Sequence, residues 1–314
     1  MPSPEPSATA TLGRWETTAM ACRVAVSAPD AGDRPAAARA LEVFAHVEEV
    51  CSRFRPTSAL ARCNARPGAW HRVPATLLRA VEEARSAHRE TGGAFDPRVH
   101  DRLVQLGYSR TFAAGPGTGA GGPAGAPPRG AWRPSTVRRV GLLHLGGQRI
   151  DLGGIGKGLA LRWAAEVMST ATDDFLVEAG GDLVASGSPG GGGWRIGVEP
   201  PDGTDQPVAV LEVSGMAVAT SSVRVRQWMS AGRSLHHLID PRTGEPGGRG
   251  LFSVTVVGPD PAWAEVWSKA LFLAGADGIG RLAAERGLAA LWVGPGDAAL
   301  SSPAMEPYVV WSRR

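Results

Sequence analysis

The stretch Ile150-Asp-Leu-Gly-Gly-Ile-Gly-Lys-Gly-Leu159 reads as a short strand, a glycine-rich turn and the start of a helix. Its glycines allow backbone amides to converge on an anion, the helix N-terminus adds the positive end of a dipole, and Lys157 adds a full charge. That combination suits a diphosphate. The spacing is not that of a P-loop, because no Ser or Thr follows the lysine, and no βαβ unit follows as in a dinucleotide fingerprint. A tight turn whose glycines serve packing alone is the structural alternative.

On both sides of this stretch, short apolar runs separated by glycine-rich turns predict strands, and apolar residues at helical spacing predict a few helices. Many consecutive strands with few intervening helices favour an α+β fold with mostly antiparallel pairing. The predicted helices are Ala36–Phe54, Pro74–Glu90, 157–169, 262–274 and 277–286. The predicted strands are Met20–Ser27, 140–145, 149–152, 174–178, 194–198, 208–213, 216–220, 235–239, 253–257, 288–293 and 306–311.

Length and composition indicate a globular chain. Its 314 residues are 43% hydrophobic and 20% charged, which is enough apolar material for a sizeable core. We expect a disordered leader over 1–14, a single domain over 15–314, and within it a flexible Gly/Pro-rich insertion at about 113–134. The net charge of +3 is small and the basic residues are scattered, so the sequence predicts no nucleic-acid partner.

The cysteines and the N-terminus give weaker indications. Cys22, Cys51 and Cys63 form no CxxC pair, which favours buried or idle thiols over a disulfide framework or a metal cluster. The first residues are polar and Pro-rich, and we find no signal peptide, lipid-anchor cysteine or membrane-spanning segment. The expected location is therefore the cytoplasm. The sequence does not predict an oligomeric state.

Four further segments could carry chemistry, although each has an ordinary structural explanation. The paired glycines of Glu178–Asp182 make a hairpin in most proteins, and the hydroxyls of Val218–Ser222 could simply cap a turn. In His236–Gly244, a histidine three residues before Asp240 places a proton acceptor near a carboxylate, yet Pro-Arg-Thr-Gly is also a common turn. Thr91–Pro97 is another glycine loop, which ends in Asp-Pro. No single segment is decisive.

Taken together and in this order, the five segments resemble the ApbE family of FAD:protein FMN transferases. The segment Phe54–Asn64 resembles that family's early Ser…Leu…Asn pattern, and the likeness extends over about residues 15–295. The resemblance implies a tunnelling-fold-like α+β architecture with FAD in a cleft between the halves. It also implies that a Thr or Ser hydroxyl of an acceptor flavoprotein takes the FMN half of FAD, that AMP leaves, and that Mg²⁺ assists.

The resemblance also assigns roles by position. His237 is implied as the base near the incoming hydroxyl, with Asp240 as its neighbour or orienting group, and Lys157 as the charge against the diphosphate. A histidine that only packs against FAD is the alternative for His237. The implied FAD-binding residues are Asp96, Gly153, Gly154, Gly156, Lys157, Gly180, Gly181, Asp182, Thr220, His237 and Lys269.

The late helix departs from the family pattern Ala-Asp-x-x-x-Thr-Ala, in which the Asp and Thr bind the metal together with a carbonyl oxygen of the glycine–lysine loop. Here the stretch is Ala264-Glu-Val-Trp-Ser-Lys-Ala270. Glu265 can serve as an oxygen ligand beside the Gly156 carbonyl, but protonated Lys269 cannot ligate Mg²⁺. Lys269 could take the metal's place and pair with Glu265, its ammonium could point to solvent while water fills the ligand position, or the helix could simply be amphipathic.

Three functions remain open on these grounds. The first is transfer of FMN to a protein hydroxyl. The second is a non-catalytic protein that binds FAD in the same cleft, and the third is an FAD pyrophosphatase in which water replaces the hydroxyl. The pair of Glu265 and Lys269 weakens the first and third, and it leaves the second unaffected.

Overall fold

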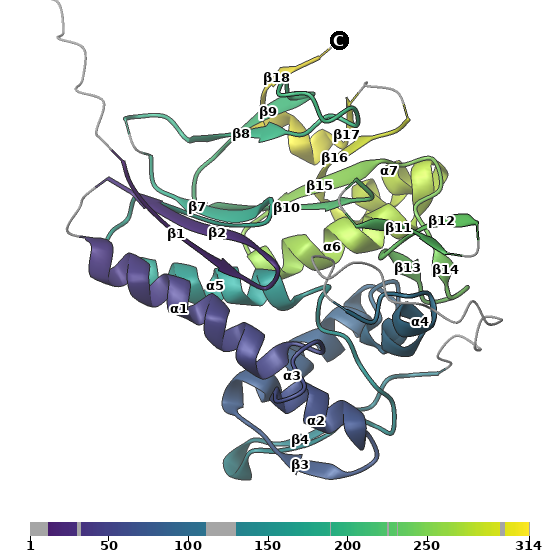
Figure 1. Ribbon diagram of the computed structural model, residues 1–314. Coiled ribbons are helices and arrows are strands. Elements are labelled where there is room, and N and C mark those ends of the chain that lie inside the picture. The colour runs from purple at the N-terminus through teal and green to yellow at the C-terminus, as the bar shows by residue number, and fades with distance from the viewer. Residues whose placement is uncertain are drawn as a thin grey trace, which may run out of the picture.

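The computed structural model describes residues 12–29, 33–110, 130–188, 190–224, 226–230, 232–295 and 299–313. At its centre is one sheet of eight strands in the order β1-β2-β6-β7-β10-β15-β16-β17 (Figure 1). Every strand pair in these ranges is antiparallel. The predicted α+β fold with antiparallel pairing is therefore confirmed. The strands are β1 (Gly13–Ala19), β2 (Cys22–Ala28), β6 (Phe175–Ala179), β7 (Asp182–Ser186), β10 (Met216–Ser222), β15 (Ser253–Gly258), β16 (Ala289–Val293) and β17 (Ala299–Ser301).

Helices cover one face of this sheet. They are α1 (Arg34–Cys51), α5 (Gly156–Met168), α6 (Pro261–Leu273) and α7 (Gly275–Arg286), and Figure 1 shows α1, α5 and α6 below the strands. Each helix buries one apolar stripe, as Phe44 and Val47 of α1 illustrate. The Asp260 carboxylate caps the start of α6 by accepting from the amide of Trp263. The predicted helices of these regions are confirmed to within about two or three residues at most ends.

A small sheet covers the opposite face. It consists of β8 (Trp194–Val198), β9 (Ala209–Val213) and β18 (Val309–Ser312), in the order β18-β9-β8. Leu176 and Leu183 of the large sheet pack with Trp194 and Leu211 of the small one in a second apolar cluster. The central strands are therefore buried on both faces, which explains why they read as continuous apolar runs.

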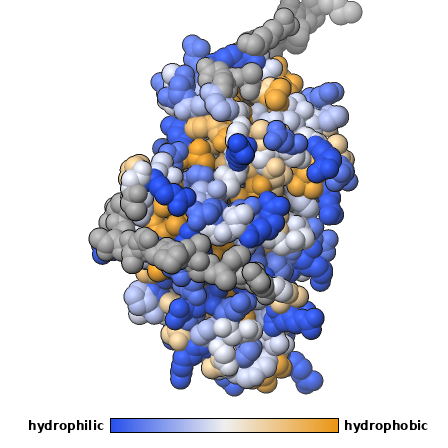
Figure 2. All heavy atoms as spheres, turned by 90° about the vertical axis from the view of Figure 1, so that its right-hand side faces the viewer, coloured by the Kyte–Doolittle hydropathy of each residue, from blue (hydrophilic) through white to orange (hydrophobic). Residues whose placement is uncertain are grey.

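The remaining elements form a lobe beyond the helices, drawn at the bottom and right of Figure 1. Its helices are α2 (Ala59–Ala65), α3 (Ala75–Glu90) and α4 (His100–Gln105), with one-turn 3₁₀ segments at Pro97–Val99 and Arg138–Val140. Its strands are β3 (Trp70–Arg72), β4 (Ser135–Val137) and β5 (Leu142–His144). Two ribbons lie on the right, β11 (Gln227–Ser230) with β12 (Arg233–His236) and β13 (Ile239–Asp240) with β14 (Glu245–Pro246). Viewed from that side, apolar side chains lie mainly in the upper half, between polar ones (Figure 2).

Three predicted strands are wrong or shifted. The backbone at 149–152 forms no ladder, because the Asn64 side chain both donates to the carbonyl and accepts from the amide of Ile150 and so replaces a strand partner. The strand predicted at 235–239 is interrupted between β12 and β13, so His237 lies in a break and not on a strand. At 306–311 a 3₁₀ segment, Pro303–Tyr308, comes first and the strand begins only at Val309.

Residues at the inner ends of the predicted leader and insertion belong to the described structure. Residues 12–14 are described and Gly13 begins β1, whereas residues 1–11 of the predicted leader lie outside the described residues. Of the insertion at 113–134, residues 113–129 also lie outside them. Its last residues do contribute to the core, because Trp132 is only 3% exposed and its Nε1 donates to the carbonyl of Leu145.

No described helix is long and apolar enough to cross a bilayer. The three cysteines are free thiols, as predicted, and burial raises the pKa of Cys51 to about 12 and that of Cys63 to about 11.

The contact between α5 and α6 depends on Gly158. A Cβ at this position would lie 2.5 Å from Ala262 Cα and 2.5 Å from the Pro261 carbonyl oxygen, both of them backbone atoms. We expect Gly158→Ala to lower the free energy of unfolding by about 3 kcal/mol, because the two helices must move apart. Urea denaturation followed by circular dichroism measures this change.

Gly280 of α7 is the matched control, because a Cβ there meets its nearest neighbours, atoms of Trp292, at 3.8 Å. We expect Gly280→Ala to raise the free energy of unfolding by about 0.5–1 kcal/mol through helix propensity. Equal effects at both glycines would contradict the close packing of α5 on α6.

Candidate active site

A group of charged side chains gathers where the first turn of α5 meets β7 and β10. Lys157 forms an ion pair with Asp182, the first residue of β7, whose carboxylate also accepts from the amide of Thr220 at 2.9 Å. Thr220 in turn shares a hydrogen bond with Thr255 of β15. The structure therefore brings together three of the predicted site residues, Lys157, Asp182 and Thr220.

A second ion pair lies beside the first. Lys269 of α6 donates to Glu265 one turn earlier, with Nζ 3.2 Å from Oε1 of the carboxylate and 3.3 Å from the Glu265 carbonyl oxygen. The other carboxylate oxygen accepts from the amide of Gly158, at 2.8 Å. Glu265 thus lies as an anion against the N-terminal turn of α5, where helix amides and dipole favour negative charge.

The glycine loop before α5 is in contact with both Phe95 and Lys269. A Cβ on Gly154 would lie 2.9 Å from the Phe95 ring and 3.3 Å from Cδ of Lys269. Only glycine lets these two side chains approach the backbone this closely. Most loop amides already have partners inside the chain, because Gly153 donates to the Asp151 carboxylate and Gly156 to the Leu152 carbonyl. The amides of Gly153 and Gly156 are thus engaged within the chain, while the binding of FAD by Gly153, Gly154 and Gly156 stays a prediction. The ammonium groups supply the positive charge beside the loop.

The two ion pairs act on one another. Burial would lower the pKa of Lys157, but Asp182 and Glu265 outweigh it and hold that pKa above its ordinary value. For Lys269, burial and the neighbouring Lys157 prevail over the attraction of Glu265 and lower the pKa. Arg226, just before β11, adds a further positive charge that acts on Lys157. The site therefore holds three cations against two carboxylates.

His237 lies near this group. Its Nδ1 is buried and has no hydrogen-bond partner within the described part of the chain. Burial, together with the charges of Arg226 and Lys269, keeps the pKa of His237 well below its usual range, and a hydrogen bond to the Arg226 backbone opposes this only in part. The imidazole is therefore neutral at neutral pH, the form that can accept a proton.

Asp240 is not the partner of His237. Its carboxylate accepts from the backbone amide and from the guanidinium of Arg242, two residues on, at 2.8–3.3 Å. Arg242 lowers the pKa of Asp240 although burial acts against it. Among the described residues, these bonds come from Arg242 and none comes from His237, so the role of Asp240 as a neighbour or orienting group of His237 stays a prediction. The hydrogen bonds of the Asp240 carboxylate thus come from within its own Asp-Pro-Arg turn.

The other predicted FAD-binding residues have structural partners. Gly180 and Gly181 form the turn between β6 and β7 with φ of +57° and +92°, and a Cβ on Gly180 would lie 2.8 Å from that of Cys22. The two glycines therefore form an ordinary hairpin turn, which was the structural explanation offered for this segment. The same turn places Asp182 at the start of β7. Buried Asp96 accepts from the Arg98 guanidinium and caps the 3₁₀ turn that follows it.

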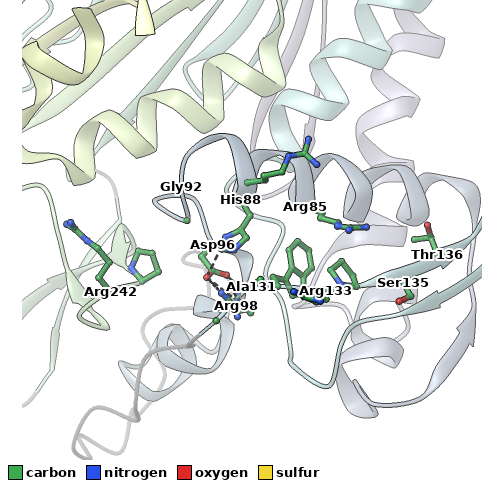
Figure 3. Close-up of a pocket in the computed structure, with 16 residues that line it drawn as sticks. Arg85, His88, Gly92, Asp96, Arg98, Ala131, Arg133, Ser135, Thr136 and Arg242 are labelled. Carbon is green, nitrogen blue, oxygen red and sulfur yellow. Dashed lines mark hydrogen bonds and ion pairs between the residues drawn. The ribbon is translucent and has the colours of Figure 1, made fainter. Parts of the chain in front are cut away.

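Asp96 faces a cavity of about 910 Å³. Figure 3 shows Asp96 beside His88 and Arg98, with Arg242 across the cavity from them. Its lining is rich in arginine and contains a single acid, Asp96. Lys157 and Lys269 do not line it, but Phe95, adjacent to Asp96, packs on the Gly154 loop. The charged groups that could act on a diphosphate therefore lie outside the cavity lining, and Phe95 lies between the Gly154 loop and Asp96 of the lining. The lining arginines are Arg85, Arg89, Arg98, Arg133 and Arg242.

The donor atoms at the predicted metal site do not suit Mg²⁺, which requires an octahedral shell of oxygen ligands. Both carboxylate oxygens of Glu265 already have N–H donors, and the ammonium of Lys269 lies where a neutral oxygen would be needed. Asp182, the other nearby acid, is engaged by Lys157. The described residues contain no group of three or more His, Cys, Asp or Glu placed to hold a metal ion.

Two residues of the site, Arg226 and Met20, were missed from the sequence. Arg226 lies next to His237, and Met20 reaches Gly156, whose Cβ would lie 3.5 Å from Cε of Met20. Met20 and Ala21 form the turn between β1 and β2 with φ of +53° and +57°, where glycine or asparagine is usual. No sequence signal points to such a turn. The amide of Met20 donates to Glu48 of α1 and helps to hold it.

Comparison with known proteins places these features in a family. The family model described as "ApbE family" matches residues 17–292. The FAD:protein FMN transferase of Treponema pallidum is 31% identical over 289 residues, which cover 81% of this chain and 76% of that protein. The FAD:protein FMN transferase of Escherichia coli K12 is 32% identical over 143 residues, but the match spans only 41% of that relative.

Solved structures give the same result for the fold. The ApbE protein of Thermotoga maritima superposes with a TM-score of 0.83 at 27% identity, covering 97% of this chain and all of that one. The apo form of the flavinyl transferase ApbE of Pseudomonas stutzeri gives a TM-score of 0.82, with 96% and 98% covered, at 23% identity.

Proposed function

This chain belongs to the ApbE family, and we propose that it transfers the FMN half of FAD to a Thr or Ser hydroxyl of an acceptor protein and releases AMP. The observation that supports the proposal most strongly is the pair of partly buried ammonium groups, Lys157 and Lys269, beside the Gly154 loop. Such a site neutralises a diphosphate where little water screens the charges, so that the charges act more strongly than on the surface.

The proposed reaction is a displacement at phosphorus. The acceptor hydroxyl oxygen forms a bond to the FMN-side phosphorus, and the bond from this phosphorus to the bridging oxygen breaks. AMP leaves with the bridging oxygen, and FMN remains attached through a phosphodiester. The hydroxyl proton passes to Nδ1 of His237, which has no hydrogen-bond partner among the described residues. Lys157 and Lys269 offset the negative charge that collects on the leaving phosphate.

The cavity beside Asp96 gives room for a bulky ligand. Its volume of about 910 Å³ is near the upper end of the range for small-molecule sites, roughly 300–1,000 Å³. We propose that FAD spans the distance from the ion pairs to this cavity, past Phe95. The cleft then lies between the helical layer and the lobe that contains α3 and α4.

Mass spectrometry of the products tests the proposal. The full chain is incubated with FAD and a pool of synthetic peptides, each with one Thr or Ser, and a parallel pool carries Ala at the same position. We expect a gain of one FMN unit on peptides of the first pool only, with AMP in equal amount. Free FMN and AMP without peptide adduct would instead identify a pyrophosphatase. Unchanged FAD that co-purifies with the chain would identify a non-catalytic FAD-binding protein.

A cytoplasmic location and a single domain over 15–314 stay part of the proposal, together with an acceptor flavoprotein as the partner.

A further inference from the structure

Lysine is rare in this chain, and both of its lysines lie at the candidate active site. Only two of its 33 basic residues are lysines, Lys157 and Lys269, and all others are arginines. Both lysines lie in the same site, with side chains 14% and 17% exposed. A solvated helix face in this chain would be expected to carry arginine, as α7 does with Arg281 and Arg286. The placement of Lys269 therefore indicates a specific use of a compact ammonium.

The geometry of Lys269 excludes a role as a surface residue. Its stem packs on Gly154, its ammonium pairs with Glu265, and the Glu265 side chain is only 1% exposed. Two of the alternatives left open by the sequence, an ammonium in solvent and a merely amphipathic helix, are thereby removed. The ammonium lies between Glu265 and the glycine loop, on the same side as Lys157.

We propose that Lys269, held by Glu265, is a built-in cation that takes the place of a divalent ion, so that this chain binds and uses FAD without Mg²⁺. The inference rests on the proposed function, because it concerns the diphosphate of FAD. It follows from the disagreement between the oxygen shell that Mg²⁺ requires and the ammonium that the structure provides.

Charge balance supports this role. Without ligand, each lysine is paired with one acid, and Arg226 adds a further positive charge. A diphosphate that enters between the lysines meets a net positive site.

FAD affinity and FMN transfer are measured for the full chain in EDTA and in Mg²⁺. FAD fluorescence quenching reports binding and peptide mass reports transfer. For the unchanged chain we expect both quantities to agree within about twofold between the two conditions. Lys269→Met should lower FAD affinity about 10- to 100-fold, because a charge-assisted contact to phosphate is lost. Lys269→Arg should retain more affinity than the methionine variant, because it keeps the charge.

Arg281→Met is the matched control. Arg281 forms the same i,i+4 pair with Glu285, but the pair is exposed on α7. This variant should bind FAD like the unchanged chain, which separates the site from any general effect of losing one positive charge.

The reciprocal change tests the same idea from the other side. In the double variant Glu265→Asp with Lys269→Thr, oxygen donors replace the ion pair. We expect weak FAD binding in EDTA and a recovery of affinity and transfer with Mg²⁺. A double variant that does not respond to Mg²⁺ would overturn the placement of Lys269 at the position of the metal.

The failures of the two proposals are distinguishable. If the unchanged chain binds and transfers only with Mg²⁺, or if Lys269→Met binds FAD normally, this inference is wrong while the proposed function stands. If FAD binds without metal and depends on Lys269, but no peptide gains FMN, the inference holds for binding and the transferase function is wrong.

Discussion

Replacement of Lys157 by methionine is expected to weaken FAD binding strongly and to destabilise the fold. The Asp182 side chain is 2% exposed, and Lys157 is its only ion-pair partner among the described residues. Loss of one partner of a buried pair leaves an uncompensated charge and typically costs about 3–5 kcal/mol. The diphosphate loses the cation that lies at the start of α5, so FAD affinity should fall about 100-fold. Urea denaturation and fluorescence titration with FAD measure the two effects.

The double variant Lys157→Met with Asp182→Asn separates stability from binding. The side-chain oxygen of the new asparagine can still accept from the backbone amide of Thr220, and no buried charge is left unpaired. Most of the lost free energy of unfolding should therefore return. FAD affinity should remain as low as in the single variant. If the double variant also regains FAD binding, Lys157 supports the fold alone and the diphosphate lies elsewhere.

Replacement of His237 by glutamine is expected to slow FMN transfer about 10²- to 10⁴-fold, which is the usual contribution of a general base. FAD affinity should change by less than about threefold, because the change keeps the size of the group and removes only its basicity. Single-turnover transfer to peptide, measured at saturating FAD, separates the two quantities. A variant that loses affinity and keeps its rate would support the alternative, in which His237 only packs against FAD.

The pH profile gives an independent test of the same role. Burial with Arg226 and Lys269 depresses the pKa of His237, so the imidazole stays unprotonated as the pH falls through 6.5, the ordinary value for histidine. Transfer should therefore persist below pH 6.5 and fall only in more acidic solution. His46→Gln, a change of an exposed histidine that is hydrogen-bonded to Thr76, should leave the rate and the pH profile unchanged. A midpoint at or above 6.5 would contradict the buried environment of His237.

The sequence predicted the fold well where patterns are local. Apolar runs between glycine turns gave the central strands, because strands buried on both faces need continuous apolar residues. It failed where a side chain replaces a backbone partner, as Asn64 does for Ile150. It also failed at the turn of Met20 and Ala21, since a strained turn without glycine carries no local signal.

For the site, the sequence identified the charged residues and, as one alternative, the pairing of Lys269 with Glu265, but not that of Lys157 with Asp182. Lys157, Asp182 and Thr220 come from three elements that are distant in sequence, and the structure brings them together. Asp240 was predicted as a neighbour or orienting group of His237, but its carboxylate is bound by Arg242, so a role beside His237 stays a prediction. The sequence around Arg226 gives no sign of a role, because Arg226 comes close to His237 and Lys157 only in the folded chain. The direction in which Lys269 points likewise required the structure.

The most direct test of the diphosphate site uses the fact that the chain has only two lysines. With lysine labelled by ¹³C at Cε, the spectrum of the full chain contains two lysine signals, which Lys269→Arg assigns by removing one. On titration with FAD, in EDTA, we expect both signals to shift together with one dissociation constant, because both ammonium groups contact the same diphosphate. If FAD quenching reports binding while neither lysine signal moves, or if no binding occurs, the account is contradicted.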